Sequence, residues 1–122
     1  MKDMPFNRLL GIRVVRTHPD GVTLECELRD ELRNSSGVLH GGVAATMADA
    51  AVGFAIACHF HGARRATTVE MKINYFLPIE SGKLTARARL LRTGTHLCVG
   101  RVDFYDDRKR LSGTAVVTYM LL

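Results

Sequence analysis

Apolar and polar residues alternate along much of the chain outside its middle, a pattern typical of strands with one buried face. Two such stretches, residues 12–17 and 22–29, flank residues 18–21, where Pro and Gly supply the dihedral angles of a tight turn. The preceding residues 4–10 predict a short helix that ends at Gly11. The chain is therefore expected to begin with a helix and a β-hairpin.

The longest apolar stretch, Val43 to Phe60, is rich in Ala and contains no Pro, which predicts a helix. About 18 apolar residues also reach the lower length limit of a membrane span. Asp49 near the centre would cost roughly 2.5–3.5 kcal/mol on insertion scales, so we predict no membrane segment. A helix that is apolar nearly all round must instead be buried nearly all round inside the protein.

Four more strands are predicted after this helix, separated by turns of hairpin length. They cover residues 68–75, 83–90, 97–105 and 111–121. The order of elements predicts an α+β domain in which a curved, mainly antiparallel sheet wraps around one long helix. Because the other face of the sheet is not uniformly polar, we expect a second copy of the chain to complete its burial in a homodimer.

Composition narrows the class of protein. A length of 122 residues supports one domain, residues 1–122, and leaves little room in one chain for an enclosed substrate cavity. The three cysteines lie far apart, unlike those of a disulfide scaffold, and no histidine has the carboxylate or thiolate spacing of a metal site. The first ten residues mix charged and apolar side chains, unlike a signal peptide. We expect a cytoplasmic protein without a metal.

The net charge of +5 is unevenly distributed. Residues 64–110 hold 11 Lys and Arg against 5 Asp and Glu, whereas the rest of the chain is nearly neutral. A basic half favours an anionic partner. Nucleic acid is not expected, because no RNP-like aromatic motif, zinc finger or recognition helix is visible. A small molecule that carries phosphate is the favoured partner, although solvated strand faces explain part of the charge.

One group of residues lies around the start of the long helix. It consists of Asn34, Gly37, Leu39, His40, Gly41, Gly42, Asp49 and Gly53. With residues 68–78, 92–94 and 118–119, this pattern resembles the hotdog superfamily, most closely the acyl-CoA thioesterases of the phenylacetate-degradation type, which include aryl-CoA thioesterases. The resemblance implies hydrolysis of an aryl- or medium-chain acyl-CoA, no cofactor besides the CoA of the substrate, and dimers that pair into a homotetramer.

Thioester hydrolysis needs donors for the negative charge on the carbonyl oxygen, and a group that delivers water or attacks the carbon. Gly41 and Gly42 offer unobstructed N–H groups at a helix start, so we expect Gly42 to polarise the carbonyl and Gly41 to bind substrate. The alternative is a glycine turn needed only for packing. Asp49 is expected to act as general base or nucleophile, because a buried carboxylate is costly unless paired or functional. Its alternative is a carboxylate hydrogen-bonded to a neighbouring strand.

Gly42 and Asp49 are seven residues apart, or roughly 10 Å along a helix, which is too far for both to contact one carbonyl carbon. We therefore expect Gly42 of one chain to act with Asp49 of the partner subunit, across antiparallel helices at a dimer interface. The resemblance implies the same arrangement.

For two further candidates, Asn34 and His40, the functional and the structural interpretation have equal weight. Asn34 holds the attacking water or the carbonyl, or it only caps its loop. His40 supports the glycine turn or the carbonyl, or it is structural. By its position, Thr68 resembles a family hydroxyl residue that helps to place water. For each basic candidate to contact the CoA phosphates, a solvated surface role is favoured over such a contact. These candidates are Arg64, Arg65, Lys72, Arg89 and Arg92.

Two other functions compete with this prediction. A hotdog hydratase or dehydratase would need a His–carboxylate dyad that acts on the acyl chain. A non-catalytic acyl-CoA-binding module would not need Asp49 on its long helix. The spacing between the His-Gly-Gly segment and Asp49 favours hydrolysis, so an acyl-CoA thioesterase is the leading prediction.

Overall fold

The computed structural model describes residues 4–122, and its elements follow the predicted order of a short helix, two strands, a long helix and four strands. A 3₁₀ turn before the long helix is an addition that the pattern does not predict. The elements are α1 (Pro5–Leu10), β1 (Arg13–His18), β2 (Gly21–Glu27), η1 (Asp30–Leu32), α2 (Gly41–His59), β3 (Ala66–Tyr75), β4 (Lys83–Thr93), β5 (Leu97–Tyr105) and β6 (Leu111–Leu121).

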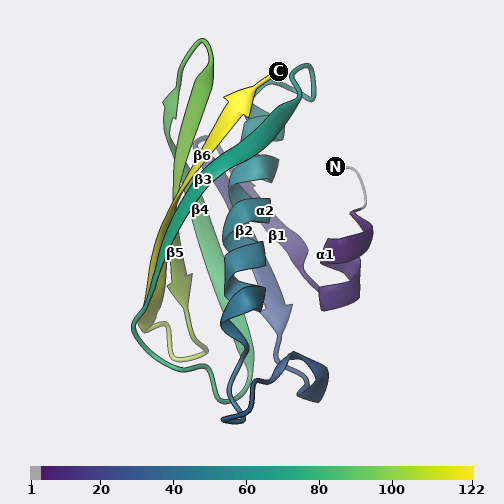
Figure 1. The fold of residues 1–122 in the computed structure, drawn as a ribbon, viewed down its shortest axis with the longest axis vertical. Helices are drawn as coiled ribbons and strands as arrows, with labels where there is room; N and C mark the ends of the chain where they lie inside the picture. Colours follow the sequence, from purple (N-terminus) through teal and green to yellow (C-terminus); the bar gives the residue numbers. More distant parts are fainter. Residues whose placement is uncertain (1–3) are drawn as a thin grey trace.

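The six strands form one antiparallel sheet in the order β1-β2-β4-β5-β6-β3. The long helix α2 lies along one face of this sheet, with β3 at the edge beside it (Figure 1). β3 runs antiparallel to α2, because its start contacts the middle of the helix and its end contacts the first turn. The predicted antiparallel sheet around one long helix is confirmed.

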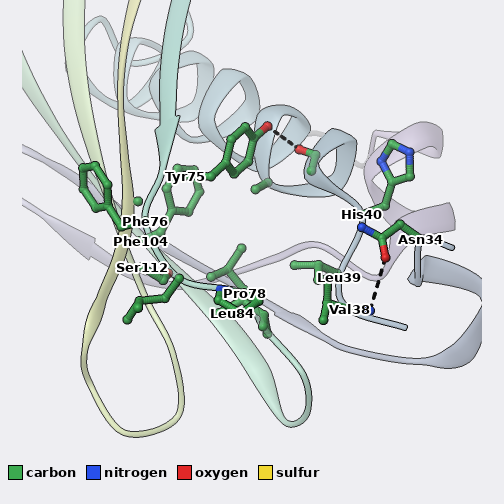
Figure 2. A pocket seen from close by; sticks show the side chains of 15 residues that line it. Asn34, Val38, Leu39, His40, Tyr75, Phe76, Pro78, Leu84, Phe104 and Ser112 are labelled. Atoms are coloured by element: carbon green, nitrogen blue, oxygen red, sulfur yellow. Dashed lines mark hydrogen bonds between the residues drawn. The ribbon is translucent and has the colours of Figure 1, made fainter. Parts of the chain in front are cut away.

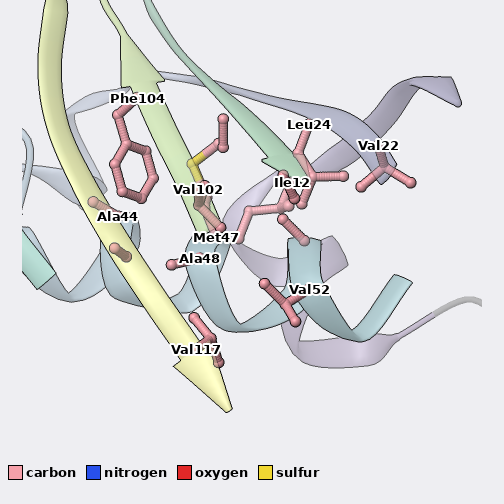
Figure 3. Packing of buried hydrophobic residues seen from close by; sticks show 14 of the residues in the cluster. Ile12, Val22, Leu24, Ala44, Met47, Ala48, Val52, Val102, Phe104 and Val117 are labelled. Atoms are coloured by element: carbon pink, nitrogen blue, oxygen red, sulfur yellow. The ribbon is translucent and has the colours of Figure 1, made fainter. Parts of the chain in front are cut away.

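The core lies between α2 and the sheet and contains the apolar residues that the alternation predicts. Val22, Leu24 and Val102 are fully buried in it (Figure 3). A glycine lets the helix approach the sheet closely, since a Cβ atom on Gly100 would lie only 2.7 Å from Val52 Cγ2. Close packing of α2 on the sheet fixes where the two ends of the helix present their polar groups.

By length and apolar composition alone, α2 could cross a membrane. A large part of its surface is instead packed against the sheet, as expected for the core helix of a globular protein. The buried residues of α2 are Val43, Ala44, Met47, Ala48, Ala51, Val52, Ala55 and Ile56.

A β-bulge in β3 changes which residues face the helix. Strict alternation puts Val69 on the buried face and Thr68 on the opposite one. In the β3–β6 register, however, Thr68 pairs with Tyr119 and Glu70 pairs with Thr118, which leaves Val69 as an extra residue. Val69 is therefore half exposed, and the Thr68 hydroxyl contacts α2. The predicted alternation is wrong at this point, because the bulge shifts it by one residue.

Candidate active site

The N-terminus of α2 is capped by His40. Its backbone is extended, with φ −62° and ψ 132°, and its Nδ1 accepts a hydrogen bond of 2.8 Å from the backbone N–H of Gly42. Nδ1 therefore carries no proton. A Cβ atom on Gly42 would lie 2.9 Å from this nitrogen, so a larger residue would disturb the cap. His40 thus contacts the glycine turn, and a role toward a substrate carbonyl stays a prediction.

Gly41, the first residue of α2, presents an unpaired backbone N–H. Within residues 4–122 this N–H has no hydrogen-bond acceptor, whereas that of Gly42 is occupied by His40. The Gly41 carbonyl accepts a hydrogen bond of 2.7 Å from the Tyr75 hydroxyl at the end of β3 (Figure 2). The Tyr75 ring also covers this glycine, since a Cβ atom on it would lie 3.2 Å from Cζ. Of the two glycines, Gly41 is the better placed to donate to a ligand.

A cavity of about 370 Å³, here called the smaller cavity, opens beside this turn. Gly41, His40 and Asn34 belong to its lining, and Figure 2 shows Phe104 on the side away from His40 and Asn34, with the Tyr75 ring between them. Most of the remaining lining is apolar. The Gly41 N–H is therefore next to space for an apolar group.

Asn34 has a clear role in its loop. Its Oδ1 accepts hydrogen bonds from the backbone N–H groups of Ser36 (2.9 Å) and Val38 (3.3 Å). The amide nitrogen is turned away from this loop (Figure 2), and among residues 4–122 it contacts no acceptor. The loop-capping interpretation is thus present in the structure, while the amide nitrogen can still donate to a ligand.

Asp49 lies on the part of α2 that faces β3 and β6. Its Oδ1 accepts hydrogen bonds from the hydroxyls of Thr68 (2.6 Å) and Tyr119 (2.8 Å). Its Oδ2 has no hydrogen-bond partner within the described residues 4–122. In a single chain Asp49 is only partly buried, because it lines a cavity. One carboxylate oxygen is held by the sheet, and the other is open.

The cavity at Asp49, here called the larger cavity, has a volume of about 1190 Å³. Thr68 lines it beside Asp49, and Arg64 and Arg65 line it from the loop between α2 and β3. This places two cations and a carboxylate around one open space. Arg92, near the end of β4, lines neither cavity.

A single chain divides the predicted site between these two cavities. Asn34, His40 and Gly41 line the smaller one, whereas Asp49 and its neighbours line the larger one. Gly42 lines neither. Gly41 precedes Asp49 by eight residues, or roughly 12 Å along the helix. The unpaired N–H and the open carboxylate oxygen are therefore not brought together within one chain.

Two tyrosines at the site have no role assigned from the sequence. Tyr75 and Tyr119 each continue the run of helix-facing residues on a strand, where they look like core residues. Each hydroxyl instead contacts α2. A tyrosine at a core position could have suggested such a contact, because a buried tyrosine hydroxyl usually finds a hydrogen-bond partner. Which partner it finds depends on the fold.

No metal centre is suggested by the described part of the chain. Residues 4–122 contain no group of three His, Cys, Asp or Glu side chains that could hold a metal ion. Cys26 and Cys98 are buried free thiols, and Cys58 is a half-buried one. Burial raises the pKa of the Cys26 and Cys98 thiols, which keeps both protonated and unreactive at neutral pH. Hydrolysis without a metal stays a prediction.

Comparison with known proteins gives a consistent family. The family model of the thioesterase superfamily matches residues 36–112. Acyl-coenzyme A thioesterase 13 of Homo sapiens is 35% identical over 100 residues, which cover 80% of this chain and 71% of the human protein. The medium/long-chain acyl-CoA thioesterase YigI of Escherichia coli is 28% identical over 133 aligned residues, covering 97% of this chain and 86% of YigI.

The fold has close counterparts among solved structures. A conserved protein from Pseudomonas aeruginosa has a TM-score of 0.93 at 26% identity, and the match covers 98% of this chain and 95% of that one. The region matched by the family model includes the glycine turn, Asp49 and Thr68. The chain belongs to the thioesterase superfamily and has the hotdog fold.

Proposed function

We propose that this protein is an acyl-CoA thioesterase that hydrolyses an aryl- or medium-chain acyl-CoA to the free acid and CoA. The observation that carries the proposal is the unpaired N–H of Gly41, a residue that lines a mainly apolar cavity at the N-terminus of α2. A thioester oxygen on this N–H would meet the positive end of the helix dipole while its acyl group enters the cavity. The activities named for the human and E. coli relatives support the same reaction.

Asp49 supplies the other half of the chemistry through its open Oδ2. As a general base, Oδ2 takes a proton from water while the water oxygen bonds to the carbonyl carbon. The carbon–sulfur bond then breaks, and the proton passes to the CoA thiolate. As a nucleophile, Oδ2 bonds to the carbon itself, CoA leaves, and water hydrolyses the resulting anhydride. Neither route needs a cofactor, because CoA is part of the substrate.

The volume of the smaller cavity supports an acyl group of limited size. A non-hydrogen atom takes roughly the 30 Å³ share of a water molecule, so about 370 Å³ holds about a dozen such atoms. Benzoyl, phenylacetyl and medium-chain acyl groups fit this space. Longer chains would need additional room outside the cavity.

The proposal puts the complete site between two copies of the chain, because Gly41 and Asp49 line different cavities. β3 contacts α2 at both places and is an edge strand of the sheet, and Val69 and Tyr75 on it are 50% and 55% exposed. Two-fold pairing of these edges would run the two α2 helices antiparallel and bring Gly41 toward Asp49 of the partner subunit. Pairing of such dimers into a homotetramer follows from the family resemblance only.

Release of free thiol from benzoyl-, phenylacetyl- and straight-chain acyl-CoAs tests the proposal. The wild type should release CoA, and Asp49→Asn should lose most of this activity. Gly41→Pro removes the N–H at a position where Pro is accepted, because it begins α2 and follows an extended His40. Its kcat should fall about 10²–10³-fold.

Gly41→Ala is the matched control, because it adds the same Cβ atom against Tyr75 but keeps the N–H. It should retain far more activity than Gly41→Pro. Equal losses in the two variants, or full activity of Asp49→Asn, would contradict the proposed roles. A wild type that binds acyl-CoA without releasing thiol would indicate a binding module instead.

A further inference from the structure

Tyr119 reaches Asp49 from β6, 70 residues away in the sequence. Its hydroxyl oxygen lies 2.8 Å from Asp49 Oδ1 and 2.7 Å from the backbone carbonyl oxygen of the same residue. The tyrosine is only 8% exposed, so its hydroxyl depends on these protein partners. Tyr119 therefore touches both the side chain and the backbone of the proposed catalytic residue.

Gly53 provides the space for this contact. It follows Asp49 by one helical turn, and a Cβ atom on it would lie 2.8 Å from the Tyr119 hydroxyl oxygen. Any side chain at position 53 would push the phenol away from the carboxylate. The glycine is thus explained by the approach of Tyr119, although a glycine inside a helix is unfavourable by itself.

Thr68 shares the same carboxylate oxygen. Its hydroxyl lies 2.6 Å from Oδ1, and it is the cross-strand partner of Tyr119 in the β3–β6 register. Two hydroxyls from adjacent strands therefore converge on Oδ1, while Oδ2 has no partner within residues 4–122. Such an arrangement fixes the rotation of the carboxylate and distinguishes its two oxygens.

We infer that Tyr119 is a positioning residue: seated against Gly53, it fixes the Asp49 carboxylate so that Oδ2 is the oxygen that acts on the thioester. This inference rests on the proposed thioesterase function. Burial raises the pKa of Tyr119, and the neighbouring Asp49 adds to this effect. The phenol consequently stays protonated at neutral pH and remains a hydrogen-bond donor.

Tyr119→Phe is the direct test, because it removes the hydroxyl and keeps the ring. Its kcat for acyl-CoA should fall about tenfold, since a hydrogen bond to a charged group is lost, with KM changed less than about twofold. Tyr105→Phe on β5 is the control and should match the wild type, because no side-chain hydrogen bond of Tyr105 is found among residues 4–122. An unchanged kcat in Tyr119→Phe would overturn the inference.

A double-mutant cycle separates positioning from a purely structural role. If Tyr119 acts through Asp49, Tyr119→Phe should have no effect on the residual activity of Asp49→Asn. A structural role would lower the activity in both backgrounds by the same factor. That second result would overturn the inference.

Gly53→Ala provides a second cycle. Alone, it should lower kcat as Tyr119→Phe does, because the methyl group displaces the phenol. Combined with Tyr119→Phe it should add no further loss, since the hydroxyl oxygen that the methyl group meets is then absent. Additive losses would show that Gly53 serves only the packing of α2, contrary to the inference.

Crystal structures of the wild type and of Tyr119→Phe provide a test that does not depend on activity. Asp49 should have one side-chain conformer in the wild type and a rotated or second conformer in Tyr119→Phe. An identical Asp49 conformer in both would overturn the inference even if the enzyme is active. If the wild type releases no thiol from any acyl-CoA, the proposed function fails, and the two Asp49 conformers still decide whether Tyr119 positions the carboxylate.

Discussion

The contact between Tyr75 and Gly41 fixes the orientation of a single peptide group. The Tyr75 hydroxyl donates to the carbonyl of the peptide group between Gly41 and Gly42, and the ring covers Gly41, so the movement of this glycine and of its own N–H is restricted. Partial burial raises the pKa of Tyr75, which keeps the hydroxyl protonated at neutral pH. An N–H that is fixed before the substrate binds costs no reorganisation when charge develops on the carbonyl oxygen.

Tyr75→Phe should therefore lower kcat for acyl-CoA by about tenfold, with a small effect on thermal stability. Thiol release and a melting curve measure the two effects, with Tyr105→Phe again as control. A normal kcat would mean that the His40 cap alone holds the turn.

Residues differ in how far the sequence could assign them. Asp49 is recognisable because a carboxylate stands out in an apolar helix, and Gly41 because glycines at a helix start leave N–H groups open. Tyr119 is not recognisable, because tyrosine fits the alternating pattern of a strand as well as any apolar residue. Its contact with Asp49 is set by the pairing of distant strands. Gly42 also looks equal to Gly41 until the His40 rotamer is known.

At the scale of elements, an ion pair ties the β1–β2 turn to β4. Asp20 Oδ1 lies 2.6 Å from an Arg87 guanidinium nitrogen. Hydrogen bonding from Arg87 is the main reason that the pKa of Asp20 lies below its ordinary value of 3.8. A carboxyl group with a lowered pKa in the folded state stabilises the protein above its unfolded pKa. It loses this contribution as the pH falls through the folded value.

Asp20→Asn should lower the Tm at pH 7 by about 1–3 °C, because the ion pair is partly exposed and contributes little. The difference from the wild type should shrink once the pH falls below 3.8. Glu80→Gln makes the same change of charge at an exposed carboxylate that has no ion pair within residues 4–122, and it serves as control. The Tm difference between the wild type and Asp20→Asn can also be measured at the lowest pH at which both proteins are folded. If it is the same there as at pH 7, the ion pair is not its cause.

The elements were largely predictable, because strand alternation and an apolar run depend on local sequence. The bulge at Val69 was not, since it follows from the register of β3 on β6 and leaves no trace in composition. This single extra residue decides that Thr68 faces Asp49. The start of α2 at Gly41 was missed by two residues for a similar reason, because the cap depends on a side-chain rotamer of His40.

At the scale of the whole molecule, the basic residues of the C-terminal half differ in whether they have carboxylate partners. Arg89 and Arg101 make ion pairs with Asp103, and Arg87 makes one with Asp20. These partners partly neutralise the basic residues of the sheet. The pair of arginines at the larger cavity, residues 64–65, has no carboxylate partner within residues 4–122. The other predicted phosphate contacts, Lys72, Arg89 and Arg92, line neither cavity, so the candidates narrow to Arg64 and Arg65.

Arg64→Gln combined with Arg65→Gln should raise KM for an acyl-CoA about five- to tenfold, because charge-assisted contacts to phosphate are lost. KM for the corresponding N-acetylcysteamine thioester, which lacks the nucleotide, should stay unchanged. Arg108→Gln with Lys109→Gln removes the same charge from the β5–β6 turn and is the control. Equal increases of KM for the two substrates would indicate damage to the site instead of loss of phosphate contacts.

The division of the site between two cavities makes the assembly itself testable. Asp49→Asn and Gly41→Pro chains, each with a different affinity tag, should each form inactive homodimers. In a purified mixed dimer, one shared site combines the intact Gly41 of one chain with the intact Asp49 of the other, whereas the second site carries both changes. About half of the wild-type activity per dimer should therefore return. If both groups acted within one chain, every site in the mixed dimer would be defective and no activity would return. A mixed dimer that is intact by mass yet inactive would thus assign the chemistry to a single chain.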